Sequence, residues 1–216
     1  LKRADKTPQT GTDETREIVQ AMLAKIEAGG EDAAIACGRE LDGYHSDIIV
    51  PADAIAAASG EICQQLKDDI RFVYDRVTTF AKAQKKSITE FETELSPRLW
   101  AGQKLIPIDT AGCYVPDGRY AHVASAIMSI ATARVAGVEN IVACTAPRGD
   151  AGPNPAILYA MGQCGADTIL ALGGVQGIAA MTFGLFTGKP AHILVGPGNR
   201  FVAEAKRMLY GRVGID

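Results

Sequence analysis

The chain has 216 residues, of which 47% are apolar and 22% charged, and its formal net charge is −3. This composition is typical of a globular protein and excludes an intrinsically disordered one. The slight acidity argues against a nucleic-acid-binding protein, which would carry a basic surface. The most apolar stretch, residues 151–186, is interrupted by Asn154, Asp167 and many glycines, so we expect no membrane span.

The five cysteines are odd in number and far apart, and none forms a CxxC pair. This pattern argues against a zinc ribbon or a redox dithiol, and it predicts reduced thiols packed in a core. The chain starts with Leu1-Lys2-Arg3 rather than with an apolar segment, so we expect no secretory signal. Together these features predict a cytoplasmic protein.

Up to about residue 105 the sequence has the periodicity of helices. Residues 61–86 give the clearest stripe, in which an apolar side chain recurs every three or four positions. Shorter helices are expected before a stop at Gly29-Gly30, over residues 31–41, and after Pro51. The first half is therefore expected to be mainly helical.

After residue 105 short apolar runs alternate with helical patterns. Three buried strands are expected, over residues 140–145, 168–172 and 191–195. Strands alternating with helices of about ten residues predict a parallel sheet covered on both faces, an α/β fold. Ligands of such sheets bind outside the carboxyl ends of the strands. We place the boundary between the two parts so that residues 1–108 precede an α/β domain over residues 109–216.

Three strand-to-helix junctions lie where an α/β ligand site would be: residues 114–118 (YVPDG), 173–176 (GGVQ) and 196–199 (GPGN). Glycines let a backbone approach a ligand closely, and the start of the next helix offers free N–H groups to a phosphate. Tight turns alone are the alternative at any one junction. Gln176 and Asn199 stand at equivalent places, and an amide can both donate and accept hydrogen bonds from a nucleotide.

Other common ligand motifs are missing from the sequence. Neither a GxGxxG fingerprint nor a P-loop lysine motif is present, which disfavours a standard dinucleotide site and an ATPase. The three histidines show no metal-ligand spacing, so we expect no metal site in this segment. Arg119 and His122 follow the Gly118 turn, where they could bind an anionic substrate; a solvated helix start is the alternative.

Longer motifs resemble those of the histidinol dehydrogenase superfamily. The matching segments are YVPDG at 114–118, GGVQGIAAM at 173–181, VGPGNRFVAEAKR at 195–207 and the terminal YGRVGID. Further matches at 29–43 and 100–109 extend the resemblance over nearly the whole chain. It implies a Rossmann-like NAD-binding domain over residues 109–216, with residues 1–108 as the mainly helical part of a first, discontinuous and here incomplete α/β domain.

The resemblance also implies an activity. Members of the family oxidise a primary alcohol twice, through an aldehyde to a carboxylate, with two NAD and a zinc ion, and we expect a homodimer. The family's NAD contacts fall on Tyr114, Gln176 and Asn199. The zinc ligands and the catalytic Glu-His pair are expected beyond Asp216, so no catalytic residue and no metal ligand is named within this sequence.

The sequence departs from biosynthetic histidinol dehydrogenases, which usually read YVPGG where this chain has Asp117, and Pro-Ser where it has Val123-Ala124. The variant pattern resembles the branch of sulfopropanediol 3-dehydrogenases, which oxidise 2,3-dihydroxypropane-1-sulfonate to sulfolactate. A sulfonate is a permanent anion, which suits Arg119 and His122 as cationic donors. The alternatives are an L-histidinol dehydrogenase that forms L-histidine, and a catalytically incomplete fragment that binds a nucleotide.

Overall fold

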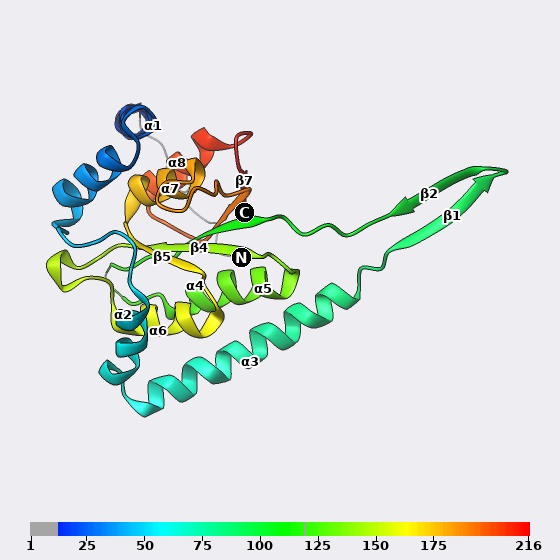
Figure 1. Ribbon diagram of the computed structural model, residues 1–216, viewed down its shortest axis with the longest axis horizontal. Helices are drawn as coiled ribbons and strands as arrows, with labels where there is room; N and C mark the ends of the chain where they lie inside the picture. Colours follow the sequence, from blue (N-terminus) through cyan, green and yellow to red (C-terminus); the bar gives the residue numbers. More distant parts are fainter. Residues whose placement is uncertain (1–12, 119) are drawn as a thin grey trace, which may run out of the picture.

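A five-stranded parallel sheet forms the centre of the protein (Figure 1). The computed structural model describes residues 13–118 and 120–216. The strand order is β5-β4-β3-β6-β7, and the strands are β3 (Thr110–Tyr114), β4 (Asn140–Thr145), β5 (Thr168–Ala171), β6 (Ile193–Val195) and β7 (Gly214–Ile215). Every pair of neighbours in this order is parallel. The predicted α/β class is confirmed, and the three expected strands are β4, β5 and β6.

Helices cover the sheet on both faces (Figure 1). On one face, α1 packs on α7 and α8, and these helices span Asp13–Asp42, Gly174–Phe183 and Arg200–Leu209. The other face carries α3 (Gln64–Lys86), α6 (Pro155–Cys164), and the consecutive turns α4 (Val123–Ala126), η2 (Ile127–Ala131) and α5 (Thr132–Ala136). Short turns complete the set, namely α2 (Ala52–Ala57), η1 (Ala58–Glu61) and η3 (Gly149–Ala151). None of the described helices is long and apolar enough to cross a membrane.

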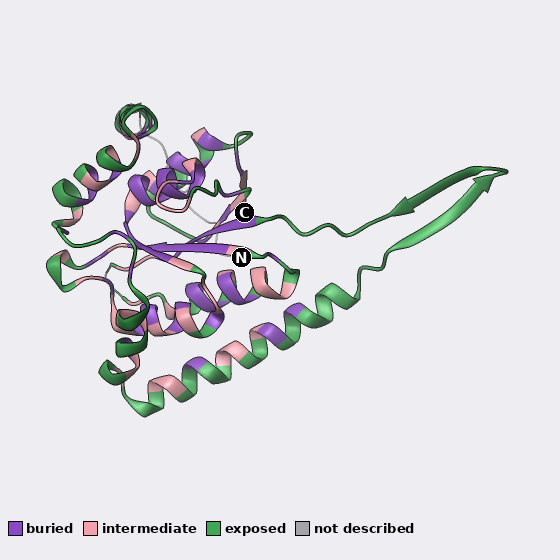
Figure 2. Ribbon diagram, in the orientation of Figure 1, coloured by how far each residue is buried: buried purple, intermediate pink, exposed green. Residues whose placement is uncertain are grey.

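The apolar core lies between the sheet and these helices (Figure 2). Ile141, Leu170 and Leu194 of the strands are completely buried, and burial of such a side chain contributes about 1.5–3 kcal/mol. Val19 and Ile26 of α1 are also completely buried and belong to the same core. The first segment of the chain therefore packs directly on the α/β sheet, and the domain boundary at residue 108 stays a prediction.

Glycines end the helices where the sequence predicts an end. Gly30 has φ 58° and ψ −140° and divides α1 into the two helices that were expected on either side of it. Gly137 and Gly165 cap α5 and α6 in the left-handed conformation, which glycine adopts without a Cβ penalty. The expected helix over residues 61–86 is α3, which begins at Gln64.

A two-stranded hairpin projects from the body of the molecule (Figures 1 and 2). It consists of β1 (Phe91–Ser96) and β2 (Leu99–Gln103), which pair antiparallel, and every residue of both strands is exposed. No strand is expected over these residues from the sequence, so the hairpin is an addition to the expected helical first half.

Candidate functional site

The order in which the chain adds strands to the parallel sheet reverses between β3 and β6. From β3 the chain proceeds outward to β4 and β5, and it then crosses to the other side of β3 to form β6 and β7. This is the order of the first five strands of a Rossmann fold, and such sheets bind ligands at the carboxyl edge where the order reverses. The three predicted junctions follow β3, β5 and β6 and therefore lie at that edge.

The first two junctions are joined by a hydrogen bond. The backbone N–H of Gly174 donates to the hydroxyl oxygen of Tyr114 at 3.0 Å. Tyr114 is only 5% exposed, and this burial raises the pKa of its phenol, so the hydroxyl stays protonated. Among the described residues the hydroxyl proton has no acceptor, so the phenol retains one donor for a ligand.

Gln176 is held by Asp42, a residue that no sequence motif identifies. Its Nε2 donates to Oδ2 of Asp42 at 2.9 Å, and the backbone N–H of Gly173 donates to the same oxygen at 3.4 Å. Gln176 is 2% exposed. Burial raises the pKa of Asp42 although both hydrogen bonds act to lower it. The N–H groups of Gly173 and Gly174 thus already have partners, which differs from the expected free N–H groups at this junction.

Asn199 is the N-cap residue of α8, the helix that follows the third junction. Its Oδ1 accepts from the backbone N–H groups of Phe201 and Val202 at 3.0 and 3.1 Å, and its side chain is exposed. The amide Nδ2 has no acceptor among the described residues. No hydrogen bond joins Asn199 to Tyr114 or Gln176 within the described chain, so the structure brings two of the three predicted residues into one network and places the third on the neighbouring junction.

Gly196 fixes the third junction against the first. Its φ is 113°, and a Cβ at this position would lie 2.1 Å from the carbonyl oxygen of Tyr114. Its N–H donates to Asp216 at 2.8 Å, and its carbonyl accepts from Nζ of Lys206 at 3.1 Å. Lys206 also pairs with Asp216. These contacts hold the β6 junction beside Tyr114.

The loop after β3 is tied to the loop after β4. Arg148 donates to both carboxylate oxygens of Asp117, at 2.7 and 2.9 Å, and the Asp117 side chain is 1% exposed. His122 lies at the N-terminal end of α4 and is exposed, while Arg119 lies outside the described residues. Asp117, noted in the sequence only as a departure from the usual motif, is therefore a buried anion with a bidentate partner.

The comparisons with known proteins identify the family. The sequence model of the histidinol dehydrogenase family matches residues 5–216. The chain belongs to the histidinol dehydrogenase family. It is 54% identical over its whole length to a sulfopropanediol 3-dehydrogenase of Ruegeria pomeroyi, of which it covers 50%. It is 36% identical over 92% of its length to a histidinol dehydrogenase of Methanothermobacter thermautotrophicus, of which it covers 46%.

A solved structure supports the same assignment. The crystal structure of histidinol dehydrogenase from Elizabethkingia anophelis matches 99% of this chain with a TM-score of 0.88 and 30% identity, and the match covers 48% of that chain. The chain thus spans about half the length of the relatives it matches. The family resemblance predicted from the junction motifs is confirmed.

The described residues offer no site for the zinc ion of this family. No group of three or more His, Cys, Asp or Glu side chains in residues 13–118 and 120–216 could hold a metal. His45 instead pairs with Asp150, and Nδ1 of His192 accepts from the N–H of Thr110. The expectation that the zinc ligands lie beyond Asp216 stays a prediction.

The three junction residues have side-chain groups of the kind that hydrogen-bond to a dinucleotide. Tyr114 and Asn199 retain donors, Gln176 retains Oε1 as an acceptor, and all three lie at junctions along one sheet edge. A Cβ at Gly177 would lie 2.8 Å from the carbonyl oxygen of Leu172, so this glycine permits close packing of α7 on its strand. Close helix–strand packing of this kind is one role of the glycines in Rossmann domains.

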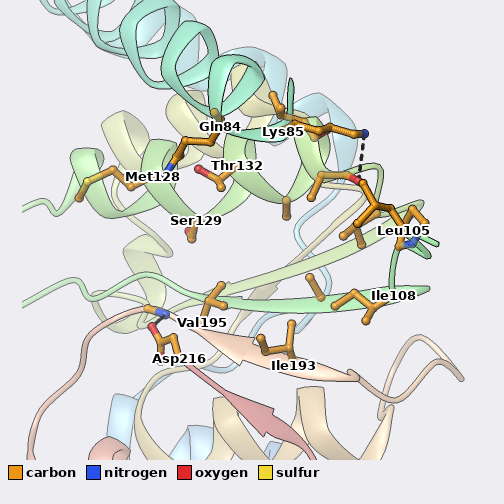
Figure 3. A pocket seen from close by; sticks show the side chains of 18 of the residues that line it. Gln84, Lys85, Leu105, Ile108, Met128, Ser129, Thr132, Ile193, Val195 and Asp216 are labelled. Atoms are coloured by element: carbon orange, nitrogen blue, oxygen red, sulfur yellow. Dashed lines mark hydrogen bonds between the residues drawn. The ribbon is translucent and has the colours of Figure 1, made fainter. Parts of the chain in front are cut away.

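A large apolar hollow lies apart from Tyr114, Gln176 and Asn199 (Figure 3). It has a volume of about 1150 Å³ and lies between α3, the α4–α5 helix and the sheet. Leu105, Met128, Ile193 and Val195 are among the side chains that line it. It reaches the third junction at Gly196 but contains none of the three predicted cofactor residues. The candidate site is therefore built from the junctions and not from this hollow.

Proposed function

We propose that the full-length protein is an NAD- and zinc-dependent dehydrogenase that oxidises 2,3-dihydroxypropane-1-sulfonate to sulfolactate. The observation that carries this proposal is the 54% identity over the whole chain to a protein named sulfopropanediol 3-dehydrogenase. Two proteins named histidinol dehydrogenase homolog are 54% and 55% identical to the chain, and proteins named histidinol dehydrogenase are 36% identical. The match to the sulfopropanediol 3-dehydrogenase runs over the whole chain and therefore spans the three junctions at the carboxyl edge, which supports the proposed substrate.

Tyr114, Gln176 and Asn199 are the proposed contacts to NAD. NAD supplies the chemistry by accepting a hydride from the substrate carbon. The Tyr114 hydroxyl and Asn199 Nδ2 donate hydrogen bonds to it, and Gln176 Oε1 accepts one. Because Tyr114 and Gln176 are buried, the bonds made by these two side chains would form where water is excluded and where an unmade bond is costly.

The reaction removes two hydrides from one carbon. The primary alcohol loses a hydride and a proton to give an aldehyde; addition of water and loss of a second hydride then give the carboxylate. Three protons are released in all for two NAD reduced. The zinc ion of this proposal has no ligand set among the described residues, so we derive no step through it.

The sulfonate is proposed to bind beside the loop after β3. His122 lies exposed at the start of α4, and Arg119, outside the described residues, precedes it by three positions. A charge-assisted hydrogen bond to a sulfonate oxygen is stronger than a neutral one. We also propose that the protein acts in the cytoplasm as a homodimer, as the family resemblance implies.

A second candidate is the oxidation of L-histidinol to L-histidine. It is favoured by the family model and by the histidinol dehydrogenase structure that matches 99% of the chain. The experiment that separates the two candidates incubates the full-length protein and NAD with each alcohol in turn. We expect two NADH for each sulfolactate formed from the sulfonated diol. Formation of histidine together with no product from the diol would overturn the substrate assignment.

A further inference from the structure

We propose that Asp42 is a positioning residue that fixes the amide of Gln176 so that its carbonyl oxygen faces the bound cofactor. This inference rests on the proposed function, in which Gln176 contacts NAD. It adds a residue from α1 to a site otherwise built from the sheet junctions, and it specifies which chemical group of the ligand Gln176 can bind.

The orientation of the amide follows from the chemistry of its partner. An ionised carboxylate accepts hydrogen bonds and cannot donate them. The side-chain nitrogen of Gln176 must therefore face Asp42, to which it donates at 2.9 Å. The opposite amide atom, Oε1, lies 3.0 Å from the position that a Cβ on Gly174 would take. The carbonyl oxygen is thus turned toward the glycine junction, and a side chain at Gly174 would obstruct it.

Burial keeps this arrangement in place. Gln176 is 2% exposed, so its amide cannot exchange its bond to Asp42 for one to bulk water without cost. Asp42 is held in turn by the N–H of Gly173 at 3.4 Å, so the carboxylate connects the end of α1 to both the backbone and the side chain of the junction. A single half-buried carboxylate therefore determines which atom of Gln176 a ligand meets.

The consequence concerns the kind of ligand group at this junction. Oε1 can accept a hydrogen bond but not donate one, so it takes a hydroxyl or amino group of the cofactor, such as a ribose hydroxyl or a carboxamide N–H. A phosphate oxygen only accepts and would find no donor in Gln176. The negative charge of Asp42 beside the start of α7 further disfavours a phosphate there, because like charges repel.

The test is a double-mutant cycle in the full-length protein, with NAD as the titrated ligand. We expect Asp42→Ala and Gln176→Ala each to raise the Kd for NAD about tenfold. The double variant should bind NAD no more weakly than Gln176→Ala alone, since Asp42 acts through Gln176. Asp42→Asn should restore most of the affinity, because its carbonyl oxygen can still accept from Nε2.

The matched control is Glu40→Ala, which removes an exposed acid from the same end of α1 and should leave the Kd unchanged. If thermal unfolding shows that Asp42→Ala does not fold, Asp42→Ser replaces it in the cycle. If Gln176→Ala raises the Kd for NAD and Asp42→Ala does not, or if the two effects are additive, the positioning role of Asp42 is overturned. The proposed contact between Gln176 and NAD then still stands. An unchanged Kd in Gln176→Ala would overturn the proposed cofactor contact, and the inference with it.

Discussion

At the scale of single residues, Asn199 combines two roles that substitutions can separate. Its Oδ1 caps α8, and its Nδ2 is the group proposed to meet NAD. Asn199→Ala should lose both, with about 1 kcal/mol of stability from the cap and about 1–3 kcal/mol of NAD binding. Asn199→Ser should keep the cap and lose only the binding. Equal NAD affinity of Asn199→Ser and the wild type in calorimetric titrations would contradict the proposed contact.

Asp42 should make stability depend on pH in a defined direction. Burial raises its pKa in the folded protein, so the folded state binds the proton more tightly than the unfolded state. The free energy of unfolding therefore falls as the pH rises from the ordinary pKa of an aspartate through the raised one. In denaturant titrations from roughly pH 4 upward, Asp42→Asn should lose less stability with rising pH than the wild type. A steeper loss of stability in the variant would show that Asp42 does not lower the free energy of unfolding as the pH rises.

The proposed anion site predicts a change in KM. Removal of a charge-assisted bond of about 1.5–3 kcal/mol by Arg119→Ala or His122→Ala should raise the KM for the sulfonated diol about ten- to a hundredfold. The turnover number should stay nearly constant if the bond is equally strong in the ground and transition states. Steady-state kinetics of the full-length variants measure both. Unchanged KM values in both variants would place the anion site elsewhere.

At the scale of elements, the junctions depend on backbone shape as much as on side chains. Gly196 combines a positive φ with a clash, since a Cβ there would lie 2.1 Å from the carbonyl oxygen of Tyr114. Gly211 has a similar φ of 92° but nothing within 4 Å of a Cβ. A comparison of substitutions at these two glycines therefore separates the cost of conformational strain from the cost of steric contact.

We expect Gly211→Ala to destabilise the protein by about 1 kcal/mol through strain alone. Gly196→Ala should cost about 2 kcal/mol or more and should also weaken NAD binding, because it displaces the junction from Tyr114. Chemical denaturation and NAD titration of the two variants provide the measurement. Similar free energies of unfolding and similar NAD affinities in both variants would show that the steric contact of the added Cβ with Tyr114 has no effect.

The helices and strands of the second half could be predicted because their signals are local. The runs at 140–145 and 168–172 are short, apolar and bounded by turn residues, and Gly137 and Gly165 end the helices before them. The hairpin of β1 and β2 gave no such signal. Its turn contains Arg98 at φ 71°, a conformation that sequence patterns assign to glycine or asparagine rather than arginine.

At the scale of the whole molecule, residues distant in sequence complete the site. Asp42 and Gln176 are 134 positions apart, and Asp117 and Arg148 are 31 apart. Strand-end positions pointed to the three junctions, because parallel strands bring their carboxyl ends to one edge, and the family resemblance pointed to Tyr114, Gln176 and Asn199 within them. No periodicity or spacing connects Asp42 with Gln176, since that contact arises only when α1 packs across the sheet.

The selectivity of the full-length protein between two alcohols distinguishes the proposed substrate from L-histidinol. The measurement is kcat/KM for NAD reduction with 2,3-dihydroxypropane-1-sulfonate and with L-histidinol under identical conditions. We expect a value for the sulfonated diol about ten- to a hundredfold higher, since one charge-assisted bond of roughly 1.5–3 kcal/mol corresponds to that factor. An equal or higher value for histidinol would contradict it.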